Sequence, residues 1–230
     1  MTIASRLNEL RNALPEGVRL VAVSKFHAIS AIREACDAGQ RLFGENRVQE
    51  LVPKYENLPQ DIEWHFVGHL QVNKVKYIAP FIAMVQSVDS LKLLEELNCQ
   101  AGKCSRRIRI LLQIHIAREE HKFGFSFDEA EELVKTGLQE RFPNLILSGL
   151  MGMATFTDDS DEIRREFASL SAFFTHLKTH YFTGNADFKE LSTGMSDDYL
   201  LAIEAGSTMI RVGTKLFGAR NASTKQALLL

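Results

Sequence analysis

Short apolar runs along the chain alternate with longer stretches in which apolar residues recur every three or four positions. Aliphatic and β-branched residues dominate the short runs, which therefore predict strands buried on both faces. Eight such runs occur, over residues 18–24, 41–43, 63–67, 81–88, 107–116, 145–150, 190–191 and 209–212. The stretches between them predict amphipathic helices, with the clearest apolar stripe over 163–177.

Polar residues mark where several of these helices begin. Asn46 with Gln49, and Ser126 with Glu129, have the spacing of a capping box, in which two side chains satisfy each other's backbone N–H groups. Asp89 is the expected N-cap of the helix that follows the fourth run. These signals support the alternation of strands and helices.

Eight strands that alternate with helices predict an α/β protein, with a single-domain (β/α)8 barrel of the TIM type over residues 1–230. The alternative is an open, doubly wound parallel sheet. We favour the closed barrel because an open sheet would leave two unpaired edges and usually has fewer strands.

Composition narrows the classes of partner. The 27 Lys and Arg residues against 29 Asp and Glu give a net charge of −2, so no nucleic-acid partner is expected. No run of about 18 apolar residues occurs, so no membrane partner is expected. The three cysteines fit no disulfide or metal framework. No signal peptide is evident, so we expect the protein in the cytoplasm. We also expect a monomer.

The carboxyl ends of the strands form the active face of such a barrel. Polar residues and glycines follow the predicted strands there, as they also follow strands in many ordinary loops. The positions are Lys25, Glu45, Asn46, Gly68, His69, Ser87, Asp89, His115, Ser192, Thr193, Arg211, Gly213 and Thr214. One lysine and two loops give the set a more specific meaning.

Lys25 directly follows the first buried strand. A lysine in this place commonly extends its amine into solvent. If the amine is instead held at the barrel mouth, desolvation lowers its pKa and makes it available for an imine with an aldehyde.

Two loops have the character of a phosphate site. Residues 192–196 (Ser-Thr-Gly-Met-Ser) follow the seventh strand, and Gly213 with Thr214 follows the eighth. Barrels often bind phosphate with the loops after strands seven and eight, where small residues allow backbone N–H groups to approach the anion. Ser196 could equally cap the next helix. Arg211, two residues before Gly213, could reach the ring of a bound cofactor or pair with a neighbouring strand.

The histidines do not favour a metal site. His65 and His69 are four residues apart, as are His176 and His180, but two histidines need helical geometry and a third ligand. Gly68 argues against a helix at the first pair, so no metal is expected.

Several motifs together give the chain a family resemblance. They are Ala-Val-Ser-Lys (22–25), Phe-Gly-Glu-Asn (43–46), Trp-His-Phe-Val-Gly-His-Leu-Gln-Val-Asn-Lys (64–74), Ser-Val-Asp-Ser (87–90), Phe-Gly-Phe (123–125), Gly-Leu-Met-Gly-Met (149–153), Leu-Ser-Thr-Gly-Met-Ser (191–196) and Arg-Val-Gly-Thr (211–214). In these positions the chain resembles the YggS/PROSC family of pyridoxal phosphate homeostasis proteins. The matches cover nearly the whole chain.

The resemblance implies a barrel like the N-terminal domain of alanine racemase, with pyridoxal 5′-phosphate (PLP) as its cofactor. It implies that Lys25 is the Schiff-base lysine and that Arg211 faces the pyridine nitrogen, with Asn46 near the ring. Ser192, Gly213 and Thr214 would hold the phosphate. The sequence departs from the family at Phe26-His27-Ala28, Thr193, His115 and Lys215, which affects contacts around the ring.

The implied function is a PLP carrier or buffer in PLP homeostasis, with apo-forms of PLP enzymes as recipients and no assigned catalytic residue. The chain ends about ten residues after Arg220, so the second domain of alanine racemase is not expected. The alternative is a weak PLP-dependent racemase or lyase that uses His115 or His69 as a second acid/base. A regulator of a partner protein would need a large apolar patch, and an aldolase without PLP would need an acid/base carboxylate. Neither feature is evident.

Overall fold

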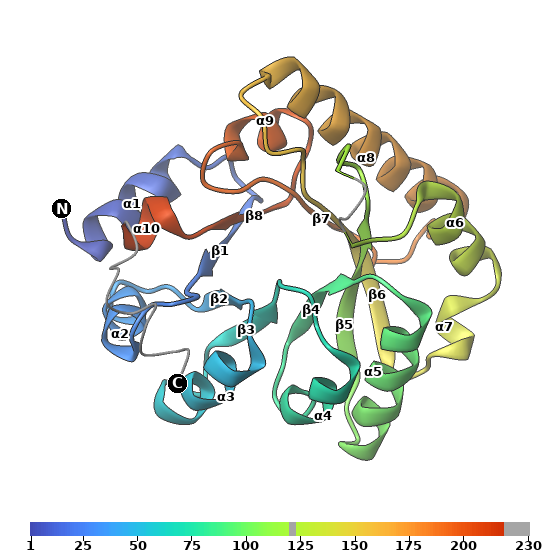
Figure 1. Ribbon diagram of the computed structural model, residues 1–230, viewed down its shortest axis with the longest axis horizontal. Coiled ribbons are helices and arrows are strands. Elements are labelled where there is room, and N and C mark those ends of the chain that lie inside the picture. Colours follow the sequence, from blue (N-terminus) through green and yellow to red (C-terminus); the bar gives the residue numbers. More distant parts are fainter. Residues whose placement is uncertain (120–122, 219–230) are drawn as a thin grey trace.

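The computed structural model describes residues 1–119 and 123–218. Eight parallel strands pair in chain order, and the last strand pairs with the first, so that the sheet closes into a barrel (Figure 1). This confirms the predicted single-domain (β/α)8 fold and rules out the open sheet. The predicted extension of the domain to residue 230 includes residues outside the described ones.

All eight strands lie where apolar runs predict them. They are β1 Arg19–Val23, β2 Leu42–Glu45, β3 Glu63–Phe66, β4 Met84–Val88, β5 Ile108–Ile114, β6 Leu145–Gly152, β7 Glu190–Ser192 and β8 Met209–Val212. β4 begins three residues later than predicted, because the N–H groups of Phe81 and Ile82 bond to the carbonyl of Ile78 and continue a helical turn.

Helices cover the outside of the barrel (Figure 1). They are α1 Ile3–Ala13, α2 Ile29–Asp37, α3 Val48–Asn57, η1 Val72–Lys74, α4 Val75–Ile78, α5 Leu91–Lys103, α6 Phe127–Lys135, α7 Leu138–Arg141, α8 Ser160–His180, α9 Tyr199–Glu204 and α10 Thr214–Phe217. α1 was not predicted, although Ile3, Leu7 and Leu10 follow the helical period and are buried. No helix in the described part of the chain is long and apolar enough to cross a membrane.

The predicted helix caps hold in one case of three. Ser126 and Glu129 form the expected capping box of α6. The box at Asn46 is wrong, because the chain stays extended through Arg47 and α3 starts only at Val48. Ser90 rather than Asp89 caps α5.

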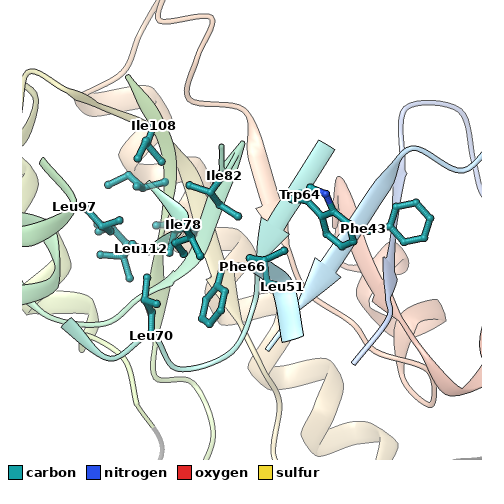
Figure 2. Close-up of a cluster of buried hydrophobic side chains, with 14 of the residues drawn as sticks. Phe43, Leu51, Trp64, Phe66, Leu70, Ile78, Ile82, Leu97, Ile108 and Leu112 are labelled. Carbon is teal, nitrogen blue, oxygen red and sulfur yellow. The ribbon is translucent and has the colours of Figure 1, made fainter. Parts of the chain in front are cut away.

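Side chains alternate between two cores along each strand. Outward-facing residues pack against the helices, and Figure 2 shows part of this layer, in which the rings of Phe43 and Trp64 lie 5.7 Å apart. Inward-facing residues form a smaller apolar cluster that includes Val21, Met84 and Leu111. Burial on both faces explains why the strands read as nearly continuous apolar runs.

Candidate functional site

Lys25 lies in the turn after β1, half-buried, at the carboxyl end of the barrel. The next residue, Phe26, has a φ of +65°, a left-handed conformation that a bulky side chain rarely adopts. Such a conformation costs about 1–3 kcal/mol and persists only where neighbouring contacts hold it. The turn that carries Lys25 is therefore a held structure.

A lysine of α3 holds the peptide on the N-terminal side of Lys25. The buried Lys54 Nζ donates to the carbonyl oxygen of Ser24 at 2.9 Å and to Glu45 Oε1 at 2.5 Å. The Ser24 hydroxyl donates to the same Glu45 oxygen at 2.6 Å. The backbone just before Lys25 is thus fixed from two directions.

Glu50, also on α3, holds the other side. Its Oε2 accepts the N–H of Phe26 at 2.7 Å and lies 3.4 Å from Lys54 Nζ. We call Ser24, Glu45, Glu50 and Lys54 the lysine clamp, because their bonds fix the peptide groups before and after Lys25.

The clamp has more acidic than basic groups. Burial raises the pKa of Glu45, and the Lys54 ammonium opposes that rise. Glu45 Oε2 and Glu50 Oε1 are buried without a hydrogen-bond partner. Buried charges in this arrangement are expensive, and hydrophobic replacements are often as stable. The clamp is therefore better explained by positioning than by stability.

Sequence reasoning missed Lys54 as part of the site. Glu50 and Lys54 are four residues apart on a helix, the spacing of an ordinary surface ion pair. The side chain of Lys54 is nevertheless only 7% exposed, because this face of α3 packs on β2.

Arg211 on β8 is a buried cation with neutral partners. Its Nη1 donates to the carbonyl and the hydroxyl oxygen of Ser192, both at 2.8 Å, and its Nη2 donates to the carbonyl of Gly152 at 3.0 Å. Burial lowers the pKa of Arg211 to about 10, which leaves it charged at neutral pH. Within residues 1–119 and 123–218 it forms no ion pair with a carboxylate.

Ser192 lies at the carboxyl end of β7, where the sequence places it, and is fully buried. Its hydroxyl, which the family resemblance implies as a phosphate contact, accepts from Arg211 and donates to Gln86 Oε1 at 2.7 Å. The hydroxyl is occupied inside the barrel because Ser192 lies on the inward-facing side of β7, next to Arg211. Its geometry suits it to hold Arg211.

Ser196 lies in the loop after β7 and contacts the loop after β8. Asp198, rather than Ser196, is the N-cap of α9, and Ser196 Oγ accepts the N–H of Gly213 at 3.4 Å. Gly194 permits this loop, since its φ is +86° and a Cβ there would lie 2.6 Å from the Cβ of Ala202. The serine that adjoins the loop after β8 is therefore Ser196.

The loop after β8 lies beside the end of β1. A Cβ at Gly213 would be 3.1 Å from the carbonyl oxygen of Val23, two residues before Lys25. Gly213 is also the N-cap of α10, and Thr214 is exposed at its first position. The small size of Gly213 thus brings the loop after β8 close to the turn of Lys25.

Asn46 follows β2 at the same end of the barrel. Its Oδ1 is buried without a hydrogen-bond partner. A Cβ at Gly68 would lie 2.7 Å from the carbonyl oxygen of Asn46, so the strand ends of β2 and β3 are in close contact. The side-chain acceptor of Asn46 is available to a ligand that offers a donor.

The two histidines considered as acid/base groups are both engaged by neighbouring groups. His69 Nδ1 lies 2.8 Å from Asp89 Oδ2, and its ring stacks on Phe123 at 3.9 Å. His115 Nε2 lies 3.0 Å from the carbonyl oxygen of Glu119. No group of three side chains suited to a metal ion occurs among the described residues.

Comparisons with known proteins match this barrel over nearly its whole length. The family profile of the alanine racemase N-terminal domain matches residues 1–221. The pyridoxal phosphate homeostasis protein of Haemophilus influenzae is 42% identical over 212 residues, which cover 91% of this chain and 88% of the relative. The Escherichia coli K12 protein of the same name is 41% identical over 217 residues, covering 92% and 89%.

Solved structures agree. PipY of Synechococcus elongatus, solved with PLP bound, superposes with a TM-score of 0.85 at 38% identity and covers 94% of this chain and 100% of its own. Alanine racemase of Streptomyces coelicolor shares the fold at 19% identity, with a TM-score of 0.74 over 94% of this chain and 58% of the racemase. The chain therefore belongs to the family of the alanine racemase N-terminal domain and, within it, to the pyridoxal phosphate homeostasis proteins.

Proposed function

We propose that this protein binds PLP at the barrel mouth, holds it as a Schiff base on Lys25, and serves as a carrier or buffer of the cofactor in PLP homeostasis. The observation that carries the proposal is the lysine clamp, which fixes the peptide groups on both sides of Lys25. The protein that contains this clamp is 38% identical to PipY, which was solved with PLP bound. The link forms between the neutral Lys25 amine and the aldehyde of PLP, with release of one water molecule.

The residues around the mouth fit such a cofactor. Gly213 offers close backbone approach and Ser196 a hydroxyl beside it, so we assign the phosphate to these two residues and Thr214. Ser192 takes part by holding Arg211 and is not assigned to the phosphate.

We assign Arg211 and Asn46 to the pyridine ring, at the other end of the cofactor from the phosphate. Arg211 forms no direct ion pair in the described part of the chain, although the charge of Asp198 acts on it from a distance. Its two unused N–H groups would face the electron-rich pyridine nitrogen. Asn46 has a buried acceptor without a partner and would lie near the ring.

The positive charge of Arg211 favours the function of a carrier rather than that of a catalyst. When bound, PLP supplies an electron sink for carbanions, and that sink is strongest when the ring nitrogen is protonated. A permanently charged guanidinium at that nitrogen disfavours its protonation. Arg211 would therefore bind the ring while weakening its catalytic power.

The alternative is a weak racemase or lyase, in which His69 or His115 acts as the second acid/base. Neither histidine is free of other partners, since each lies within hydrogen-bond distance of a neighbouring group. Incubation of the loaded protein with a panel of amino acids in deuterated water distinguishes the two functions. The carrier exchanges no α-hydrogen, whereas either enzyme would exchange it.

Transfer to recipients tests the carrier function. The loaded protein is mixed with an apo-form of a PLP enzyme in the presence of a phosphatase that destroys free PLP. We expect the wild-type protein and Lys76→Ala, an exposed lysine on α4, to restore the recipient's activity, whereas Lys25→Ala does not. Equal restoration by Lys25→Ala, or a wild-type protein that retains no PLP, would overturn the proposal. As part of the same proposal, the carrier is a cytoplasmic monomer.

A further inference from the structure

A chain of hydrogen bonds runs through the interior of the barrel from Arg211. Arg211 donates to Ser192 Oγ, which donates to Gln86 Oε1 at 2.7 Å. Gln86 Nε2 lies 2.8 Å from His65 Nδ1, and His65 Nε2 lies 3.0 Å from Glu63 Oε1. The chain thus connects residues of β8, β7, β4 and β3, and ends on a carboxylate.

Chemistry fixes the direction of each bond. An amide NH2 only donates, so His65 Nδ1 accepts from Gln86 and its proton resides on Nε2, where it faces the carboxylate of Glu63. If the amide of Gln86 were reversed, His65 would need protons on both nitrogens. Burial lowers the pKa of His65 and disfavours that charged form. The reversed amide would also leave the Ser192 hydroxyl facing two donors.

Burial makes this chain of hydrogen bonds rigid. Ser192, Gln86 and His65 are each 0% exposed, so an unmade hydrogen bond among them would leave a polar group without water. Such a loss costs about 1–3 kcal/mol per group, which holds a satisfied network in one arrangement. The Ser192 hydroxyl therefore presents a fixed lone pair to Arg211.

We propose that Gln86 and His65 are positioning residues for Arg211. Acting through the Ser192 hydroxyl, they add a third hydrogen bond to those that Arg211 makes with the carbonyls of Ser192 and Gly152, and so restrict the plane of the guanidinium and the direction of its remaining N–H groups. This inference rests on the proposed function in assigning those N–H groups to the cofactor ring. The hydrogen-bond chain consists of protein groups alone and is therefore testable in the ligand-free protein.

The first experiment uses ligand-free protein labelled with ¹⁵N. We expect His65 to show a protonated Nε2 and an unprotonated Nδ1, and Arg211 to show separate guanidinium signals because its rotation is restricted. Gln86→Met, which keeps the length of the side chain but removes the acceptor, should merge the Arg211 signals. Gln86→Glu, which restores an acceptor for Ser192, should separate them again. Unchanged Arg211 signals in Gln86→Met would overturn the proposal.

The second experiment measures PLP dissociation by absorbance. Gln86→Met should release PLP about tenfold faster, equivalent to ~1.4 kcal/mol. Leu111→Ala is the matched control, since Leu111 lies in the barrel interior but outside the hydrogen-bond chain. An equal acceleration by Leu111→Ala would mean that general loosening, and not positioning, is responsible. A wild-type protein that captures no PLP would refute the proposed function, whereas the ligand-free spectra would still decide whether Gln86 orients Arg211.

Discussion

Lys54 Nζ donates to the carbonyl oxygen of Ser24, 2.9 Å away, and so fixes the peptide that leads into Lys25. The clamp lysine comes from α3, thirty residues along the chain, and is itself buried between two carboxylates. A buried cation is thus used to hold the backbone next to the lysine proposed to bind PLP.

Replacing Lys54 should damage both folding and PLP capture. In Lys54→Met the carboxylates of Glu45 and Glu50 lose their shared cation, so we expect a loss of about 3–5 kcal/mol in the free energy of unfolding. Capture of PLP should slow because the turn of Lys25 is no longer held. Urea unfolding and the rise of the PLP–protein absorbance measure the two effects.

The control for this variant is Lys76→Met, on the exposed face of α4, which should change the free energy of unfolding by no more than about 0.5 kcal/mol. The double variant Glu45→Gln/Lys54→Met should recover part of the loss, because it removes one of the unpaired charges. A Lys54→Met protein as stable as Lys76→Met would show that the clamp contributes little.

Ser192, the last residue of β7, and Ser196, in the loop that follows, should behave differently. Ser196→Ala removes a hydroxyl beside Gly213 and should weaken PLP binding about tenfold, or ~1.4 kcal/mol, with little effect on unfolding. Ser192→Ala removes the hydroxyl that accepts from Arg211 and leaves Gln86 Oε1 without a donor, so it should lower stability by about 1–3 kcal/mol. Titration with PLP and urea unfolding separate the effects. The assignment fails if Ser196→Ala binds PLP like the wild type while Ser192→Ala remains stable and loses PLP.

Acid should destabilise the protein through His65. Burial lowers the pKa of His65 below its ordinary value of 6.5, so below pH 6.5 the unfolded chain takes up a proton that the folded protein refuses. The free energy of unfolding therefore falls as the pH drops from 6.5, by at most ~1.4 kcal/mol per pH unit for this one group.

Glu63 makes the free energy of unfolding depend on pH in a second, lower range. The hydrogen bond from His65, assisted by Arg19, lowers the pKa of Glu63 from 4.5 to about 2, although partial burial opposes the shift. The stability from Glu63 is present above pH 4.5 and is lost between 4.5 and 2. Unfolding curves of the wild type and His65→Gln at pH 7.5, 6.5 and 5.5 isolate the upper range. Parallel pH dependence in both proteins would contradict this role of His65.

The pattern of apolar runs was sufficient to predict the barrel because every strand is buried on both faces. It also placed Arg211 and Gly213 correctly at the end of the last strand. In a parallel barrel the last residues of every strand lie at the same, carboxyl end. The side-chain direction at Ser192 was not predictable in the same way. β7 has only three residues, too few to establish the alternation that turns Ser192 inward and leaves Ser196 in the loop.

The sequence of β3 does indicate that polar residues lie inside the barrel. Glu63 and His65 alternate with Trp64 and Phe66 in β3, which marks one face of a buried strand as polar. That face points into the barrel, where Gln86 of the next strand lies. The lysine clamp had no comparable signal, since burial of Lys54 depends on how α3 packs on the barrel.

The central claim is that Lys25 holds PLP covalently. Reduction of the PLP-loaded protein with borohydride, followed by peptide mass mapping, tests it most directly because reduction makes the link permanent. We expect the modified residue to be Lys25, and we expect no modification in Lys25→Arg. A modification on Lys54 or on an exposed lysine with Lys25 unlabelled, or no modification at all in a protein that has bound PLP, would contradict the account.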